Sequence, residues 1–145
     1  MNQAGQLRIV REFAAPRPEV FSWWAAPEKL SQWSGCKEAT TCRVEMDFRV
    51  GGSFTQRMQL QGLGEFVITG RYEEIVVPER IVYVADLSFA TSRVAVEFTE
   101  TVTGTRVTVS QEGLDHPVVF DNVSRGTADS FAKLETLLTP CKELA

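Results

Sequence analysis

The sequence predicts an α+β protein in which a strongly curved antiparallel sheet is closed over by one long helix. Three observations predict this fold class. An aromatic-rich stretch at residues 18–33 has the spacing of short helices, alternating segments fill residues 42–111, and residues 118–138 return to helical spacing. A single helix must then cover one face of the sheet, and this arrangement tends to leave an internal cavity.

The first strand and two short helices occupy the first 33 residues. Apolar and polar side chains alternate over Leu7–Phe13, which favours a strand. Pro16 and Pro18 end this strand, since proline cannot donate to a strand ladder but is tolerated in the first turn of a helix. Helical spacing begins at Glu19, Pro27 breaks that helix, and the segment PEKLSQW predicts a second short one.

Two strands joined by glycines are predicted next. Residues 42–49 alternate with a period of two. Gly51 and Gly52 then supply a tight hairpin, because glycine adopts a positive φ without steric cost. The returning strand precedes a turn at residues 61–64 and places on one face Phe54, Gln56, Met58 and Leu60.

Four more strands complete the predicted sheet. Residues 66–77 form a long strand with Gly70 in its interior, which indicates a bulge or a sharp bend. Shorter alternating segments follow at residues 80–87, 94–98 and 107–111. The short turns between these strands imply a meander.

The last segment has the period of an amphipathic helix of about five or six turns. Asp115 is placed to cap its N-terminus, and Pro117 lies near its first turn. Its inward stripe recurs every three or four residues through Phe120, Val123, Thr127, Phe131, Leu134 and Leu138. The predicted organisation is therefore β-α-α-β6-α, in one domain over residues 1–145.

Composition narrows the classes of partner and compartment. The 145 residues carry a net charge of −4, and their Lys and Arg residues are scattered singly, so we expect no nucleic-acid partner. No apolar run approaches the ~20 residues of a membrane span, and no secretory signal is visible at the N-terminus. Three cysteines without CxxC spacing and one histidine favour a reduced, cytoplasmic protein with no zinc site and no cofactor. A homodimer is left open.

Individual polar residues have two readings each. His116 is a general acid–base candidate or a loop residue facing solvent. Asp47 and Arg49 either anchor a polar ligand or form an ion pair that fixes the hairpin. Cys42 alternates with Val44 and is expected to be an inert buried thiol, whereas a loop places Cys36 nearer to solvent.

The aromatic side chains fill a core or line a cavity, and a concave sheet against one helix favours the cavity for the set as a whole. Polar groups are placed in the same cavity by strand alternation or by a position at its mouth. The candidate ligand-binding residues are Phe21, Trp24, Trp33, Phe48, Phe54, Gln56, Met58, Phe66, Tyr83, Gln111, His116 and Phe120.

The order of these motifs resembles the START-like (SRPBCC, birch-pollen-allergen-like) superfamily, in its branch similar to the activator of heat-shock-protein-90 ATPase. The residues that carry the resemblance are Val20, Phe21, Trp24, Pro27, Glu28, Leu30 and Trp33, the segments DFRVGGSF, GRYEEI and PERIVY, and Gly126, Phe131 and Leu134. The resemblance implies the helix-grip fold with a hydrophobic pocket. The family usually has Gly-Trp where this chain has Gly126-Thr127, so Thr127 is added to the candidate pocket residues.

The resemblance implies three functions from different classes. The first is binding of a small apolar or amphipathic ligand in the pocket. The second is an enzyme similar to polyketide cyclases, aromatases or hydratases, for which His116, Tyr83 and Asp47 are the candidate catalytic residues. The third is a co-chaperone-like interaction module. The ligand, and whether any reaction is catalysed, are not determined by the sequence.

Overall fold

The computed structural model describes residues 6–33, 39–60, 62, 64–87, 91–114 and 117–138. Within these residues the chain forms seven strands and three helices in the predicted order. The strands are β1 (Leu7–Phe13), β2 (Ala39–Met46), β3 (Ser53–Leu60), β4 (Gly64–Val76), β5 (Arg80–Asp86), β6 (Thr91–Glu100) and β7 (Thr105–Glu112), and the helices are α1 (Arg17–Ala25), α2 (Pro27–Trp33) and α3 (Pro117–Leu138).

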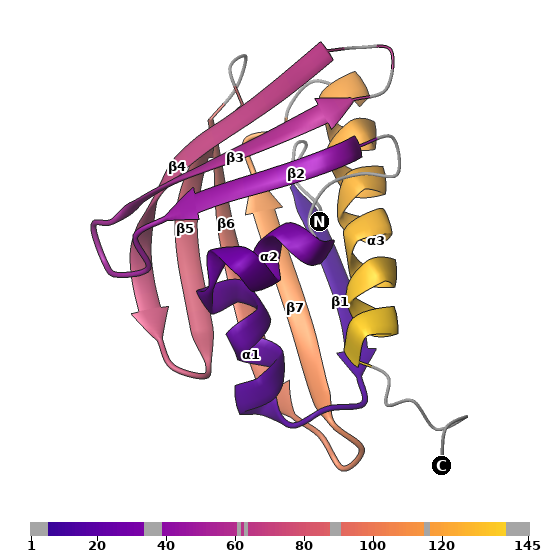
Figure 1. Cartoon of the computed structure of the whole chain (residues 1–145). Coiled ribbons are helices and arrows are strands. Elements are labelled where there is room, and N and C mark those ends of the chain that lie inside the picture. The colour runs from indigo at the N-terminus through magenta and orange to yellow at the C-terminus, as the bar shows by residue number, and fades with distance from the viewer. Residues whose placement is uncertain are drawn as a thin grey trace.

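The seven strands form one antiparallel sheet in the order β1-β7-β6-β5-β4-β3-β2. β2 to β7 follow one another as a meander, and β1 joins its far edge by pairing with β7. The sheet curves strongly, so that β2 and β3 cross in front of the other strands (Figure 1). The α+β helix-grip prediction is confirmed by this arrangement.

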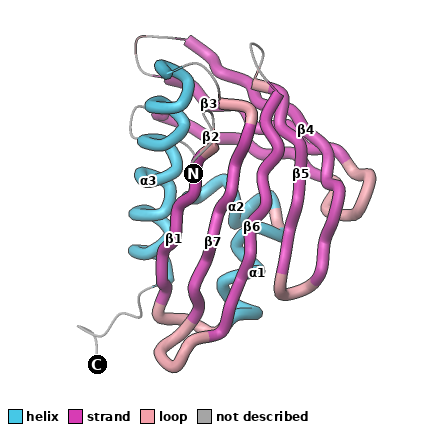
Figure 2. Tube along the Cα trace, turned by 180° about the vertical axis from the view of Figure 1, so that it is seen from behind, coloured by secondary structure: helices cyan, strands magenta, loops and turns pink. Residues whose placement is uncertain are grey.

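All three helices lie on the concave face of the sheet, which Figure 2 shows from the opposite side with the strands in front. α3 packs against β1 and α2. A hydrogen-bonded ion pair also ties α3 to β1, since Arg11 Nη2 lies 2.6 Å from Glu135 Oε1. The helix is therefore anchored at the β1 edge of the sheet.

The best-packed part of the core lies where α1 meets the sheet. Phe98 of β6 contacts Phe21 and Trp24 of α1, with ring centroids 5.1 and 5.0 Å apart. Phe13 of β1 meets Phe131 of α3 edge to face at 5.8 Å. These side chains are at most 7% exposed, so the rings fill this end of the molecule.

The β2–β3 connection is longer than the predicted glycine hairpin. β2 ends at Met46, and residues 47–52 form a loop closed by hydrogen bonds from Asp47 N to Ser53 O (2.9 Å) and from Gly52 N to Arg49 O (2.8 Å). Gly51 adopts a φ of 85°, as expected for a turn glycine. The alternation continues past Met46 because Phe48 packs inward from the loop, against Phe21.

Gly70 does not mark a bulge, which corrects the prediction. Its neighbours pair in register with both β3 and β5, and the register shift falls between Tyr72 and Glu74. Glycine is required at this position for a different reason. A Cβ on Gly70 would lie 2.3 Å from Phe54 Cζ and 2.4 Å from the Val84 carbonyl oxygen, so the Phe54 ring occupies the space of a side chain.

Some predictions fall on residues that the structure does not describe, namely the helix cap at Asp115, the exposure of Cys36 and part of the turn at residues 61–64. Cys42 is half-buried, not fully buried, and its sulfur accepts a hydrogen bond from Gln56 Nε2 at 3.5 Å. None of the helices within the described residues has the length and apolar character needed to cross a membrane.

Candidate functional site

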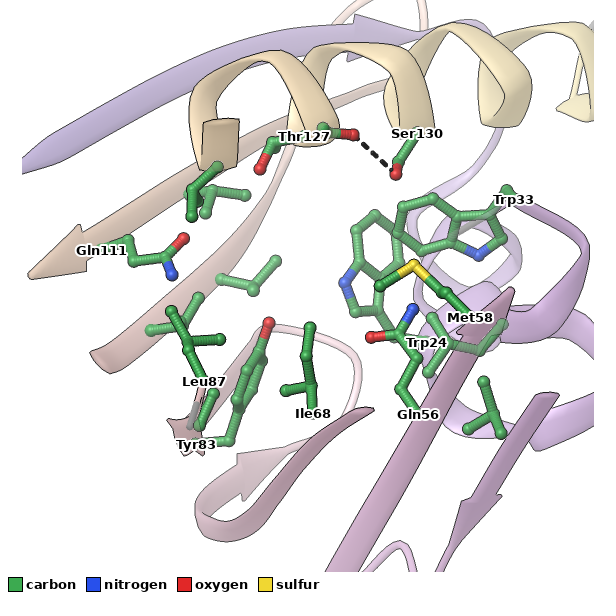
Figure 3. A pocket seen from close by; sticks show the side chains of 18 of the residues that line it. Trp24, Trp33, Gln56, Met58, Ile68, Tyr83, Leu87, Gln111, Thr127 and Ser130 are labelled. Atoms are coloured by element: carbon green, nitrogen blue, oxygen red, sulfur yellow. Dashed lines mark hydrogen bonds between the residues drawn. The ribbon is translucent and has the colours of Figure 1, made fainter. Parts of the chain in front are cut away.

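A pocket of about 610 Å³ lies between the concave face of the sheet and α3. Its volume falls within the roughly 300–1,000 Å³ of typical ligand pockets. Most of its lining is apolar, and Figure 3 shows side chains converging on it from the strands below and from α3 above.

Strand alternation places the floor of the pocket. In a strand every second side chain points to the same face. The inward set of β3 includes Phe54, Gln56 and Met58, and these pair across the ladder with Gly70, Ile68 and Phe66 of β4. The inward side chains of β5, β6 and β7 continue the floor with Ile81, Tyr83, Ala85, Val94, Val96, Val109 and Gln111.

Trp24 and Trp33 form one end of the pocket. Their ring centroids lie 4.6 Å apart, and Trp33 also stacks on Phe131 at 6.0 Å. The indole N–H of Trp33 donates to the backbone oxygen of Trp23 (2.9 Å), which holds α2 against α1 and fixes the ring. This end consequently presents ring surface, with the polar atom of Trp33 already satisfied.

Thr127 and Ser130 of α3 face the pocket from above (Figure 3). The Ser130 hydroxyl donates to the Gly126 carbonyl oxygen one turn back (2.8 Å). Glycine and threonine at positions 126 and 127 are small, so α3 leaves space for the pocket here. Bulkier residues at these two positions of the inward stripe would project into the pocket.

Two tyrosines from neighbouring strands reach the pocket. Tyr72 and Tyr83 pair in the β4–β5 ladder, and their ring centroids are 6.2 Å apart. Burial raises the pKa of Tyr83 to about 12. Burial, and secondarily the Coulombic effect of Tyr83, raises the pKa of Tyr72 still further above its ordinary value. Both hydroxyls are therefore neutral at physiological pH, and each can donate a hydrogen bond.

The charged residues that line the pocket, Arg125 and Asp129, both come from α3. Arg125 is exposed, and its Nη2 donates to Asn122 Oδ1 (2.8 Å). The side chains that the strands contribute to the described lining are uncharged. The electrostatic pattern is an apolar floor with neutral polar groups and a charged rim on one helix.

The structure brings many of the predicted site residues together. The pocket is lined by Trp24, Trp33, Phe54, Gln56, Met58, Phe66, Tyr83, Gln111 and Thr127. Three others lie elsewhere. Phe21 is buried against Phe98, Phe48 packs between Phe21 and Tyr72, and Phe120 packs on a smaller cluster that includes Leu87 and Leu114. His116 lies outside the described residues.

The two catalytic candidates that the structure describes, Tyr83 and Asp47, lie apart. Tyr83 lines the pocket, whereas Asp47 does not. Asp47 Oδ2 accepts a hydrogen bond from Arg49 Nε at 2.6 Å in the exposed β2–β3 loop. Asp47 is therefore placed as the hairpin ion pair, the structural alternative weighed from the sequence.

Several lining residues were not among the sequence candidates. Tyr72 and Ile68 share a strand face with Phe66, and Leu87 shares one with Tyr83, so strand alternation could have identified them. Val123, Gly126 and Ser130 lie on the inward face of α3. The sequence candidates were mostly aromatic or polar, which left out aliphatic residues such as Ile68 and Leu87 but does not account for Tyr72.

The fold and the pocket together define a START-like helix-grip domain. A family model described as Activator of Hsp90 ATPase homolog 1-like protein matches residues 14–139. The chain belongs to this family, as its motifs predicted. A search of curated proteins gave no match.

Solved structures share the fold over nearly the whole chain. Protein CV1439 from Chromobacterium violaceum is 25% identical, with a TM-score of 0.87 over 94% of this chain and 98% of that one. A protein from Rhizobium leguminosarum is 28% identical, with a TM-score of 0.76 over 92% and 93% of the two chains. A third, NE0264 from Nitrosomonas europaea, is 24% identical, with a TM-score of 0.78 over 95% and 96%.

Proposed function

We propose that this protein binds a small hydrophobic or amphipathic molecule in the pocket between its sheet and α3. The observation that carries the proposal is the pocket itself, about 610 Å³ in volume and lined mostly by apolar side chains. Transfer of an apolar ligand into such a site is favourable by about 25 cal/mol for each Å² of apolar surface removed from water. The few neutral polar groups would orient the ligand.

A catalytic role is the second candidate, and one observation favours it. The Tyr83 hydroxyl faces the pocket (Figure 3) and could protonate a bound substrate. With its pKa raised to about 12, however, Tyr83 is a poor general base near neutral pH. Asp47 lies away from the pocket, and the carboxylate that lines it among the described residues, Asp129, comes from α3 and not from the strand floor that carries Tyr83. Binding is the better supported of the two functions.

A steric block tests the binding proposal. Thr127→Trp would project an indole into the pocket from α3, whereas Thr136→Trp places the same side chain on the exposed face of the same helix. We expect wild type and Thr136→Trp to bind the neutral fluorescent probe N-phenyl-1-naphthylamine. We expect Thr127→Trp to bind it at least about tenfold more weakly, a difference of about 1.4 kcal/mol.

Thermal unfolding should show that both variants are folded. If folded Thr127→Trp binds the probe as wild type does, the pocket is not the binding site and the proposal fails. Native mass spectrometry of protein isolated from its own host would then identify any co-purified ligand. For the enzyme alternative, a substrate turned over equally by wild type and Tyr83→Phe would eliminate Tyr83 as the acid.

A further inference from the structure

We infer that the pocket selects a planar, uncharged aromatic molecule that carries a carbonyl group. The Tyr83 hydroxyl and the Gln111 amide would hold the carbonyl, and the Trp24–Trp33 end would hold the aromatic rings. The inference rests on the proposed function and specifies its ligand class.

The sheet register places the two polar groups on either side of one small residue. Tyr83 of β5 pairs with Val94 of β6, and Val94 pairs with Gln111 of β7. Neighbouring strands are about 4.8 Å apart, so the backbones of Tyr83 and Gln111 are separated by roughly 10 Å. Figure 3 shows both side chains directed into the pocket, where a carbonyl above Val94 could reach either donor.

Both groups have unused hydrogen-bonding capacity. Within the described part of the chain, no hydrogen bond joins the Tyr83 hydroxyl or the Gln111 amide to another protein group. Gln56, the other pocket glutamine, already donates to Cys42 Sγ (3.5 Å), and Ser130 donates to Gly126. Buried polar groups are nearly always satisfied. Tyr83 and Gln111 are half-buried and line the pocket, so a ligand atom or pocket water can partner them.

The opposite end of the pocket offers ring surface. Figure 3 places Trp24, Trp33 and Met58 together on the side away from Gln111. The two indole rings are inclined at 62°, and the Trp33 N–H is committed to Trp23 O. This end presents ring faces and edges, with the Met58 thioether and the Gln56 amide beside them (Figure 3). An aromatic ligand can pack favourably here, edge to face or offset-stacked on the indoles and against the Met58 sulfur.

The charges of the lining residues favour a neutral carbonyl over a carboxylate beside Tyr83 and Gln111. The charged lining groups within the described residues are Arg125 and Asp129, of opposite sign and one turn apart on α3. Among the described residues, the strands that form the floor around Tyr83 and Gln111 contribute no cation. A carboxylate at that position would lose its hydration without gaining a counter-ion, which is costly, whereas a neutral carbonyl needs only hydrogen-bond donors. Tyr83 is such a donor, since an ordinary tyrosine pKa of about 10 already keeps the hydroxyl protonated at pH 7.5, and burial raises its pKa to about 12.

Three probes of nearly the same shape test the inference by titration calorimetry at pH 7.5. They are 2-acetylnaphthalene, which carries a ketone, 2-isopropenylnaphthalene, which carries an alkene, and 2-naphthoate, which carries a carboxylate. We expect the ketone to bind about three- to tenfold more tightly than the alkene, the gain from one net hydrogen bond. We expect 2-naphthoate to bind most weakly.

Variants assign the preference to residues. Tyr83→Phe and Gln111→Met should each reduce the ketone-to-alkene ratio toward one while leaving the affinity for the alkene nearly unchanged. Gln59→Met is the matched control, since Gln59 lies on the exposed outer face of β3 and should leave the ratio as in wild type. The alkene affinity also reports whether each variant retains a folded pocket.

The outcomes separate this inference from the proposed function. Equal affinity of wild type for ketone and alkene would overturn the inference while supporting an apolar binding pocket. Tightest binding of 2-naphthoate would overturn it in favour of an anionic ligand. Binding of N-phenyl-1-naphthylamine without binding of any naphthalene probe would also overturn the ligand class. Failure to bind any of the four compounds would count against the proposed function itself.

Discussion

Aromatic side chains line both ends of the concave face, but at one end they are packed together and at the other they border a pocket. Near α1, Phe13, Phe21 and Phe98 pack edge to face and leave little of their surface accessible. Under α3, Phe66 and Tyr83 retain accessible surface that faces a pocket. We call the first the closed end and the second the pocket end.

The difference comes from what covers each end of the sheet. α1 brings Phe21 down onto the closed end, whereas Trp24 and Trp33 border both that end and the pocket. At the pocket end the cover is α3, which presents the small residues Gly126, Thr127 and Ser130 next to Phe131. Whether an aromatic ring belongs to the core or lines the pocket therefore depends on the side chain packed opposite it. The type of the aromatic residue does not determine this.

The largest contrast is expected from truncating one phenylalanine at each end. Phe98→Ala removes a ring packed on Phe21 and Trp24, and we expect it to lower the free energy of unfolding by about 3–5 kcal/mol. Phe66→Ala should cost less than about 2 kcal/mol, because that ring already lacks packing partners on its pocket side. Urea denaturation measures both. Equal losses would mean that the two ends are packed alike.

The second-largest difference between the closed end and the pocket end is expected in the stability at alkaline pH. Tyr83 is protonated in the folded state up to about pH 12, whereas in the unfolded chain it ionises near 10. Because the pKa of Tyr83 is higher in the folded state than in the unfolded chain, its protonated hydroxyl contributes fully to the free energy of unfolding below pH 10. This contribution is lost as the pH rises from 10 to 12. The loss is on the order of 2–3 kcal/mol.

The decline in stability over this window should be shallower in Tyr83→Phe than in wild type, as followed by chemical denaturation at fixed pH values. The Phe13→Leu variant at the closed end provides the comparison, since it changes no ionisable group and should retain the wild-type slope. An unchanged slope in Tyr83→Phe would contradict the assignment of this pKa to the pocket.

A smaller effect is expected at the position where Phe54 crosses its neighbour strand. Gly70→Ala would place a Cβ 2.3 Å from the Phe54 ring and 2.4 Å from the Val84 carbonyl oxygen. We expect a loss of about 1–3 kcal/mol from this overpacking. Thr69→Ala on the exposed face of β4 is the control and should cost under about 1 kcal/mol. A neutral Gly70→Ala would contradict this expectation and would show that both the Phe54 ring and the Val84 backbone shift to accept the added Cβ.

The smallest effect is expected outside both ends. Arg80 is the first residue of β5 and is partly exposed. Its Nε lies 3.1 Å from Glu74 Oε1, and its Nη1 lies 2.5 Å from Glu97 Oε2. Arg80→Met should lower the free energy of unfolding by less than about 1 kcal/mol, and by less still at high salt. A loss comparable with that of Phe98→Ala would mean that surface ion pairs, and not ring packing, stabilise the sheet.

Particular residues show how far the sequence predicted the site. Strand alternation correctly put Phe54, Gln56 and Met58 on one face, and that face lines the pocket. The same rule placed the end of β2 too far along the chain. The strand ends at Met46, and Phe48 packs inward from the following loop as a strand residue would. Phe21 and Phe48 were predicted as lining, yet they are packed by each other and by Phe98 and Tyr72, contacts between segments far apart in the chain.

The sequence by itself determined the order of strands and helices, the faces they bury and the family, because periodicity and turn residues are local properties. Only the tertiary structure decided which buried side chains border empty space. That depends on the curvature of the sheet and on where α1, α2 and α3 settle against it. Tyr83 and Gln111, 28 positions apart in the chain, share one polar site because the ladder places Val94 between them.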